Sequence, residues 1–435
     1  MCENIIECDK GLVKEAEITP SLFKPNYKRC IHMVLPTALS FLGFRLPTRE
    51  YSSLTDTARL RRTMENNSCF DSDKVIMVVA DSVGIEQFRK SSYLSNIYNE
   101  TNGFQLSSVF PTITSTALAS IHMATPPGIH GIFGHKIFFK ELGAVVDTLK
   151  MSTLSVGARD SLIRAGIDAR ALTYCSSPYD LVEQQGIEHV ELLEDEIAGT
   201  GLSNMIYRRQ VARGFNNLID AFSMARQALE EEKDKKVMVN LYTGILDSLS
   251  HKYGPYSEEY SIGMRFLDEN IRRLVGSIRD STAEKTTLVF LADHGQDPID
   301  PRLEIVFSRD EIEKLGKFLR APAGKSGRVM HFYVKDGFQE DTVHELKKKV
   351  GERGYLVTFE DAIRTFVGKT MNLKMSKMRL GDIILILKKG VNVEIRRDES
   401  QNRWEEPLRG SHGSMTLNEL LVPFISVKLS QLKKY

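Results

Sequence analysis

Short apolar runs alternate with longer segments of helical periodicity along most of the chain. Runs with the character of β-strands cover residues 75–80, 104–110, 143–149, 169–175, 236–242, 286–292 and 382–387. Between them, residues 216–235 and 258–280 place apolar side chains at the spacing of an amphipathic helix. Strands that alternate with helices predict an α/β fold, in which a largely parallel central sheet carries helices on both faces.

The same pattern divides the chain into three parts. Residues 1–70 carry no catalytic motif and mix prolines with scattered arginines, so we expect an N-terminal extension packed on the core. Residues 71–295 and 381–435 are expected to form the catalytic core. Residues 296–380 read as a strand, a helix and a mixed segment, which indicates a small α+β cap insertion. Residues 31–44 are apolar but too short to cross a bilayer, so we expect them to be buried.

Composition favours a soluble enzyme that acts on a small molecule. The chain has 58 basic and 57 acidic residues, a balance that gives no reason to expect nucleic-acid or membrane binding. The five cysteines are scattered, odd in number and without a C-x-x-C pair, which favours free thiols in a reducing compartment. The first residues, MCENIIECDKGLVKEAE, have acids where a signal peptide has its apolar region. These observations predict a cytoplasmic protein.

Seven polar side chains lie where a fold of this class gathers its ligands. They follow predicted strands (Asp81, Asp293, His294), lie four residues apart on a predicted helix (Asp247, His251), begin a helix (Thr114) or lie in a glycine-rich loop (His412). Each has an ordinary alternative explanation, such as an ion pair, a helix cap or a solvated loop residue. Together, carboxylates and imidazoles suit Zn²⁺, with Mn²⁺ or Mg²⁺ as alternatives. The ends of strands are also where open α/β sheets bind their ligands.

The order of these motifs resembles the alkaline phosphatase superfamily and, within it, the type I phosphodiesterase and nucleotide pyrophosphatase family. The supporting segments, between about residues 74 and 425, are VIMVVADSVG, FPTITSTALASIHMATPPGIHGIFGH, DSLSHKYGP, LADHGQ and SHGS. The resemblance implies an alkaline-phosphatase-like sandwich, two divalent metal ions and a cap over the active site. It further implies that one metal is held by Asp247, His251 and His412, and the other by Asp81, Asp293, His294 and Thr114, with Thr114 as the nucleophile.

These ligands predict a hydrolase of phosphodiester or pyrophosphate bonds that forms a covalent phosphothreonine. A threonine hydroxyl is a weak nucleophile at neutral pH, and coordination to a divalent cation lowers its pKa. Three aspartates, two dications and an ionised Thr114 sum to zero charge, which suits a diester better than a monoester dianion. Two alternatives remain open. One is a phosphomonoesterase or phosphonate hydrolase with the same metals, and the other is a non-catalytic binding protein with this fold.

The chain departs from the resembled family near the nucleophile. Ser115 stands where many relatives have an aromatic residue, and His135 stands where they have an asparagine that binds a phosphoryl oxygen. We therefore expect His135 to contribute to substrate binding, as a hydrogen-bond donor or, if it is protonated, as an added positive charge. His122 is expected to serve in packing or capping, and His130 to hold its loop.

Overall fold

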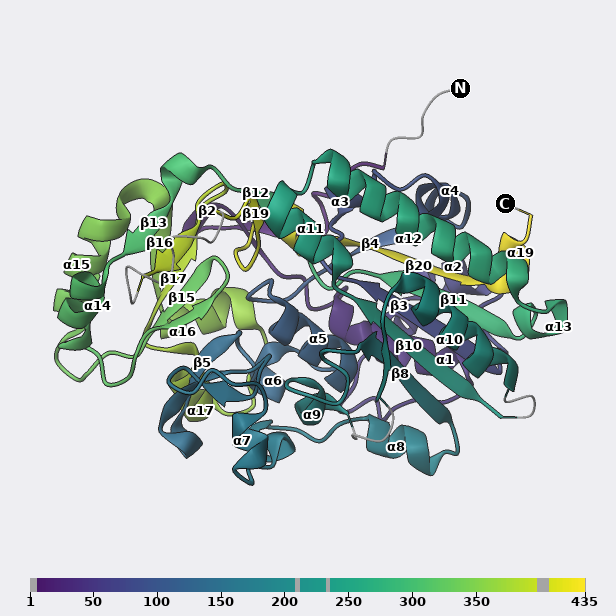
Figure 1. The fold of residues 1–435 in the computed structure, drawn as a ribbon, viewed down its shortest axis with the longest axis horizontal. Helices are drawn as coiled ribbons and strands as arrows, with labels where there is room; N and C mark the ends of the chain where they lie inside the picture. The colour runs from purple at the N-terminus through teal and green to yellow at the C-terminus, as the bar shows by residue number, and fades with distance from the viewer. Residues whose placement is uncertain (1–5, 208–211, 232–234, 397–406, 435) are drawn as a thin grey trace.

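The computed structural model describes residues 6–207, 212–231, 235–396 and 407–434. Its centre is a seven-stranded sheet with the strand order β4-β20-β11-β3-β10-β8-β9 (Figure 1). The strands are β4 (Phe104–Ser107), β20 (Leu421–Lys428), β11 (Thr286–Leu291), β3 (Lys74–Ala80), β10 (Val237–Thr243), β8 (Glu188–Glu194) and β9 (Ala212–Phe215). Only β20 runs antiparallel to its two neighbours among the described strands of this sheet. The predicted largely parallel α/β sheet is confirmed.

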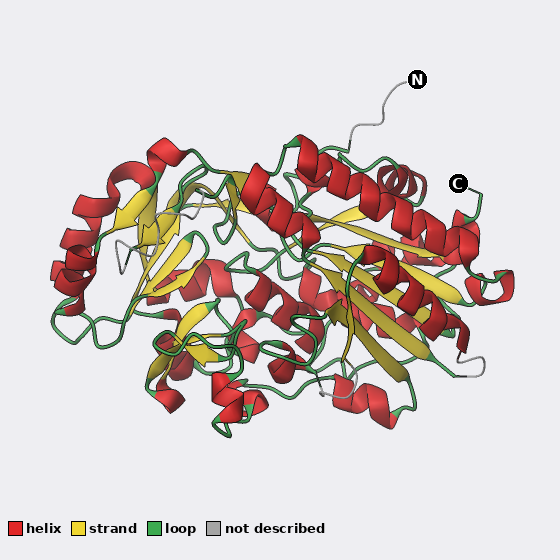
Figure 2. Cartoon of the chain, viewed as in Figure 1, coloured by secondary structure: helices red, strands yellow, loops and turns green. Residues whose placement is uncertain are grey.

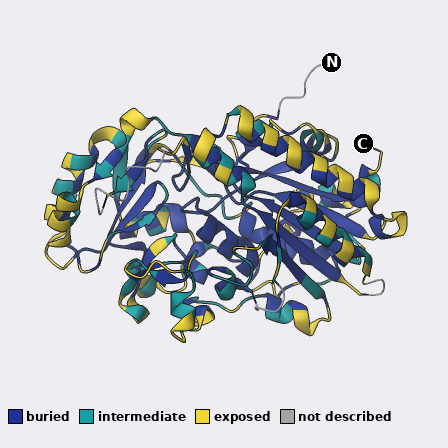
Figure 3. Cartoon of the chain, viewed as in Figure 1, coloured by how far each residue is buried: buried dark blue, intermediate teal, exposed yellow. Residues whose placement is uncertain are grey.

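Helices cover this sheet on both faces. In Figures 1 and 2, α10 (Leu218–Glu231) and α12 (Glu258–Ser277) lie in front of the sheet, and α1 (Val34–Phe41) lies behind it. Every residue of β3, β10 and β11 is buried, as expected for strands that are covered on both sides (Figure 3). The exposed residues of α10 and α12 lie on their outer faces, which explains their amphipathic sequence pattern.

The register of the parallel strands brings their carboxyl ends to one edge. Thr243 of β10 lies beside Ala80 of β3, and Leu291 of β11 lies beside Val79. The chain therefore leaves these three neighbouring strands at nearly the same level. The residues that follow each strand meet at this edge, as in other open α/β sheets.

A second sheet of seven strands, in the order β16-β17-β15-β14-β5-β6-β7, packs beside the first. Its strands are β5 (Lys136–Phe139), β6 (Ala144–Asp147), β7 (Ser152–Thr153), β14 (Gly324–Ser326), β15 (Val329–Phe332), β16 (Gly354–Thr358) and β17 (Ile383–Leu387). All its described pairings are antiparallel. Helices α14 (Arg309–Gly316) and α15 (Gln339–Val350) lie at its outer end (Figure 1).

Three predicted strand runs need correction. Residues 143–149 and 382–387 do form strands, β6 and β17, but in the second sheet and not in the central one. Residues 169–175 contain a 3-10 helix, Ala169–Leu172, because the Asp168 side chain accepts a hydrogen bond from the backbone N–H of Arg170 and starts a tight turn. The division into extension, core and cap stays a prediction, although β17 lies beyond the expected cap boundary at residue 380 and pairs with β15 and β16.

The N-terminal residues contribute to the main core. A hairpin of β1 (Lys14–Ala16) and β2 (Thr19–Lys24) precedes α1, whose eight residues are all buried. The apolar segment at residues 31–44 is thus largely buried, as expected. None of the helices in the described ranges has the length and hydropathy needed to cross a bilayer. Cys8, Cys30, Cys69 and Cys175 are free thiols, and Cys2 lies outside the described residues.

Candidate metal centre and nucleophile

The seven predicted site residues come from five separate segments and meet at the carboxyl edge of the central sheet. Asp81 directly follows β3, and Asp293 and His294 follow the end of β11 by two and three residues. Asp247 and His251 lie on α11 (Ile245–Tyr253), which begins directly after β10, and His412 follows β19 (Gly410–Ser411). Their donor atoms form two clusters, Asp247/His251/His412 and Asp81/Asp293/His294, and within each cluster all lie within 4.8 Å of one another.

Thr114 is the first residue of α5 (Thr114–Met123) and lies beside the second cluster. Its Oγ1 is 3.4 Å from Asp81 Oδ2 and 3.3 Å from His294 Nε2. The backbone N–H groups of the first helical turn and the helix dipole favour an anion at this end of a ten-residue helix. The threonine hydroxyl therefore lies beside the second cluster, at a helix end that favours an anion.

In the first cluster, backbone carbonyls fix the orientation of both histidines. His251 Nδ1 donates to the carbonyl oxygen of Gly410 at 2.8 Å, and His412 Nδ1 donates to that of Thr112 at 3.0 Å. Each Nε2 lone pair is thereby directed toward Asp247 Oδ1, at 3.3 and 3.4 Å. Burial would raise the pKa of Asp247, but His251 and His412 lower it to about 2, so this residue is a carboxylate. The set presents one carboxylate and two imidazole nitrogens, which suits a divalent cation.

The second cluster holds two buried carboxylates with unsatisfied oxygens. Asp81 Oδ1 and Asp293 Oδ2 have no hydrogen-bond partner among the described residues. Burial raises the pKa of Asp293 to about 7, and burial together with the neighbouring Asp293 and Asp247 raises that of Asp81 well above its usual range. Two ionised carboxyl groups buried this close together repel one another and are costly to desolvate, unless a cation neutralises their charge. The residues present therefore fit a metal ion in this cluster too.

Three residues that sequence analysis missed hold these ligands in place. Ser82 donates from Oγ to Asp247 Oδ1 at 2.8 Å and from its backbone N–H to Asp293 Oδ1 at 3.2 Å, so it links the two clusters. Gln296 donates to Ser82 Oγ at 3.0 Å and also to Asp247. Tyr242 donates a short hydrogen bond to Asp81 Oδ2. Ser82 and Gln296 lie within two residues of predicted ligands, and this proximity could have identified them from the sequence. Tyr242 lies in an apolar strand, where nothing in the sequence indicates a role at the site.

Two glycines allow the ligand loops to approach closely. A Cβ on Gly295 would lie 2.6 Å from the Cα of Gly84 and 2.1 Å from the carbonyl oxygen of Asn418. A Cβ on Gly84 would in turn lie 2.8 Å from the Cα of Gly295. The loops after β3 and β11 are therefore in direct backbone contact, and this contact sets the distance between Asp81 and Asp293.

A cavity of about 250 Å³ adjoins the candidate metal site. Thr114, Asp81, Asp247, His251, His412 and His135 line it at one end, and apolar side chains continue it, namely Leu118, Leu149, Leu193, Ile197, Leu202 and Ile206. His135 Nε2 is buried without a partner, and burial together with His412 holds the pKa of His135 well below its usual range. The structure thus brings His135 to the same cavity as Thr114, as a neutral imidazole.

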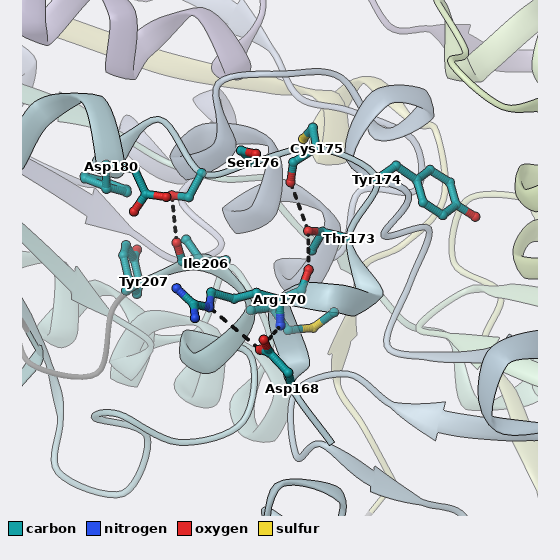
Figure 4. A pocket seen from close by; sticks show the side chains of 12 residues that line it. Asp168, Arg170, Thr173, Tyr174, Cys175, Ser176, Asp180, Ile206 and Tyr207 are labelled. Atoms are coloured by element: carbon teal, nitrogen blue, oxygen red, sulfur yellow. Dashed lines mark hydrogen bonds and ion pairs between the residues drawn. The ribbon is translucent and has the colours of Figure 1, made fainter. Parts of the chain in front are cut away.

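A neighbouring cavity of about 360 Å³ contains none of the predicted site residues (Figure 4). Among the described residues, it shares only Ile206 and Tyr207 with the cavity at Thr114.

The expected structural role of His130 is supported, since its Nε2 is 2.9 Å from Ser120 Oγ and its Nδ1 accepts from the backbone N–H of Ile132 at 3.1 Å.

Comparisons with known proteins agree with this geometry. The sequence model of the family described as type I phosphodiesterase / nucleotide pyrophosphatase matches residues 75–415. GPI ethanolamine phosphate transferase 1 of Yarrowia lipolytica is 37% identical over 87 residues, which are 19% of this chain and 9% of that protein. The protein of the same name from Neurospora crassa is 32% identical over 85 residues, 19% of this chain and 8% of that protein. The chain thus matches less than a tenth of the length of these curated relatives.

Two solved structures share the fold at low sequence identity. Murine ectonucleotide pyrophosphatase/phosphodiesterase 5 superposes with a TM-score of 0.60 at 14% identity, covering 83% of this chain and 93% of that one. Phosphonoacetate hydrolase from Sinorhizobium meliloti superposes with a TM-score of 0.55 at 17% identity, covering 82% of this chain and 93% of that one.

Proposed function

Because the chain belongs to the type I phosphodiesterase / nucleotide pyrophosphatase family, we propose that this enzyme hydrolyses phosphodiester or pyrophosphate bonds of a small molecule through a covalent intermediate on Thr114. The observation that carries the proposal is the position of Thr114. Its hydroxyl lies within 3.4 Å of Asp81 and 3.3 Å of His294, at the N-terminus of a buried helix.

The residues of the site have separate tasks in this reaction. Thr114 releases its hydroxyl proton to solvent, and Oγ1 forms a bond to phosphorus while the bond to the leaving oxygen breaks. The amides at the start of α5 bind phosphoryl oxygens. A water molecule then attacks phosphorus, the bond to Thr114 breaks, and the proton of the water is released. Two divalent cations in the clusters, for which Zn²⁺ suits the donors best, would lower the pKa of the nucleophile and neutralise phosphoryl charge.

The charges around Thr114 favour a monoanionic diester over a dianionic monoester. Arg159 is the one lysine or arginine among the described residues that line the cavity, and its guanidinium donates to the carbonyl oxygen of Leu149 at 3.0 Å. His135 is neutral because of its burial, so it adds a hydrogen-bond donor and no charge. We therefore assign His135 a role in holding a phosphoryl oxygen of a diester.

Phosphonate or monoester hydrolysis is the second candidate. It is supported by the fold shared with phosphonoacetate hydrolase, since the same two clusters could serve either reaction. The short match to GPI ethanolamine phosphate transferase 1 supports a third outcome, in which an alcohol instead of water releases Thr114. These outcomes differ in substrate and acceptor, and product analysis distinguishes them.

The test compares bis(p-nitrophenyl) phosphate, p-nitrophenyl phosphate and p-nitrophenyl phenylphosphonate at pH 8, with metal-loaded protein and with protein dialysed against a chelator. We expect about two divalent ions per chain, a higher kcat/KM for the diester and loss of hydrolysis after chelation. Full activity after dialysis would contradict the two-metal proposal. A higher kcat/KM for the monoester or the phosphonate would favour the second candidate. No release of p-nitrophenol from any ester, with or without an added alcohol, would favour a binding protein.

A further inference from the structure

One face of α5 presents three side chains to the cavity at Thr114. Thr114, Leu118 and His122 are spaced four residues apart, and all three line the cavity. Residues at this spacing lie on the same side of a helix, one turn apart. His122 lies about 12 Å from Thr114 along the helix axis, since each residue adds about 1.5 Å. The cavity therefore has a histidine two turns away from the nucleophile.

A buried polar network fixes the hydrogen-bonding state of His122. Its Nδ1 is 2.8 Å from the hydroxyl oxygen of Tyr179, which also accepts a hydrogen bond from Asn240 Nδ2 at 2.8 Å. Asn240 Nδ2 also donates to Glu191 Oε2 at 2.9 Å. The Glu191 carboxylate fixes the orientation of the Asn240 side-chain amide. With the amide reversed, Asn240 Oδ1 would face Glu191 Oε2, and the two oxygens would repel one another. The Tyr179 proton is then left for His122 Nδ1, so the proton of the neutral imidazole is on Nε2.

His122 Nε2 is a donor without a partner. The residue is 1% exposed, and no described group bonds to this nitrogen. Burial lowers the pKa of His122 to about 4, so the ring is neutral at pH 7. Nδ1 of His122 is hydrogen-bonded to Tyr179, so Nε2 is the ring nitrogen that can bond to a ligand in the cavity. An unpaired buried donor costs about 1–3 kcal/mol, and an acceptor on a bound ligand would recover part of that cost.

The far side of the network makes it rigid. The ring of Tyr179 stacks on His189 with centroids 4.2 Å apart and planes 8° apart, and the ring of Tyr207 meets His122 edge-on at 4.9 Å. Beyond Tyr179 and Tyr207 lies the neighbouring cavity of Figure 4, where Asp168 and Arg170 bond to one another and Thr173 bonds to backbone carbonyls.

We propose that His122 is a specificity-determining residue that donates a hydrogen bond from Nε2 to an acceptor atom on the organic group of the substrate. The inference rests on the proposed phosphodiesterase function and adds a substrate class to it. The axial distance of about 12 Å, less about 2 Å for the bond from Thr114 Oγ1 to phosphorus and about 3 Å for one hydrogen bond, places the acceptor roughly 7 Å from phosphorus. The preferred substrate carries an otherwise apolar chain with an oxygen or nitrogen acceptor at that distance, because the walls between are apolar.

The experiment uses three p-nitrophenyl alkyl phosphates whose alkyl groups have equal length. The groups are n-heptyl, 2-butoxyethyl and 5-methoxypentyl, so an ether oxygen is absent, close to phosphorus or at the proposed distance. In the metal-loaded wild type we expect kcat/KM to be about tenfold higher for the 5-methoxypentyl than for the 2-butoxyethyl ester, the value of one hydrogen bond. His122→Phe should reduce this ratio to about one. Tyr179→Phe should reduce it in part, because His122 can then hold its proton on either nitrogen.

The control variant is Tyr355→Phe. It removes a hydroxyl of the second sheet, which donates to the carbonyl oxygen of Pro20, and it should keep the wild-type ratio of kcat/KM values. An equal ratio in wild type and His122→Phe, with all esters hydrolysed, would overturn the role of His122 and leave the proposed function intact. No hydrolysis by metal-loaded wild type would count against the proposed function instead. The tautomer is tested separately by ¹⁵N NMR, with the His122 signals assigned from their absence in His122→Phe. A proton on Nδ1 would overturn the inference whatever the activity.

Discussion

Thr114 and its neighbour Thr116 provide a matched test of the nucleophile. Thr114 Oγ1 contacts Asp81 and His294, whereas Thr116 Oγ1 is buried on the same helix without a partner. We expect Thr114→Ala to lower kcat by about 10³-fold or more, because the covalent route is lost, while the melting temperature stays close to that of the wild type. Thr114→Ser should keep measurable turnover. Comparable loss in Thr116→Ala would show that the nucleophile has been assigned to the wrong residue.

Tyr242 tests whether the carboxylates are held for a metal ion. Its hydroxyl donates to Asp81 Oδ2, and residues that orient metal ligands in this way commonly change metal affinity about 10–100-fold when removed. We expect Tyr242→Phe to release metal at correspondingly lower chelator concentration, measured by competition with a chromogenic chelator. Tyr355→Phe serves as the control. Wild-type metal retention in Tyr242→Phe would mean that Asp81 needs no such support.

At the scale of the elements, the contact between the loops after β3 and β11 can be tested with one methyl group. Gly295→Ala places a Cβ 2.6 Å from the Cα of Gly84, in the loop after β3, and 2.1 Å from the Asn418 carbonyl oxygen, so the two loops must separate. We expect about 1–3 kcal/mol of destabilisation and a large loss of bound metal. Gly276→Ala in α12 is the control, since nothing lies within 4 Å of its Cβ. It should stabilise the protein by about 0.5–1 kcal/mol and leave activity unchanged. Retained metal in Gly295→Ala would show that the spacing is not critical.

The elements that carry the site could be predicted because their signals are local. An apolar strand that ends in Asp81 or in Asp293 and His294 fixes where these side chains emerge, and parallel register brings the strand ends together. The second sheet could not be predicted, because β5 and β14 are almost 190 residues apart and their apolar runs look like those of any other strand. Tyr242 gave no sequence signal for a related reason, and His122 was expected only to pack or cap. Buried polar residues within apolar segments resemble core residues, and their hydrogen-bond partners become apparent only in the structure.

At the scale of the whole molecule, buried neutral histidines make stability depend on pH. Burial lowers the pKa of His32 to about 4, and its Nδ1 has no partner among the described residues. The unfolded chain binds a proton at this histidine below its ordinary pKa of about 6.5, and the folded protein does not until about pH 4. Its contribution to stability is therefore lost progressively as the pH falls from about 6.5 to 4.

As the pH falls from about 6.5 to 4, we expect the wild type to lose on the order of 3 kcal/mol of unfolding free energy that His32→Leu does not lose. Urea unfolding of both proteins at several pH values between 7 and 4 measures the difference. Comparing the two proteins cancels the titration of the groups that they share, except where a shared group such as His130 interacts electrostatically with His32. A difference that does not change with pH would show that His32 is accessible to protons in the folded state.

The place of β20 inside the central sheet has a consequence for biosynthesis. Residues 421–428 lie between β4 and β11 and supply hydrogen bonds to both, although β4 is made more than 300 residues earlier. Until these residues have left the ribosome, two apolar strand edges stay unpaired, and such edges are prone to pair with other chains. The central sheet is therefore completed only after translation of the region that contains β20.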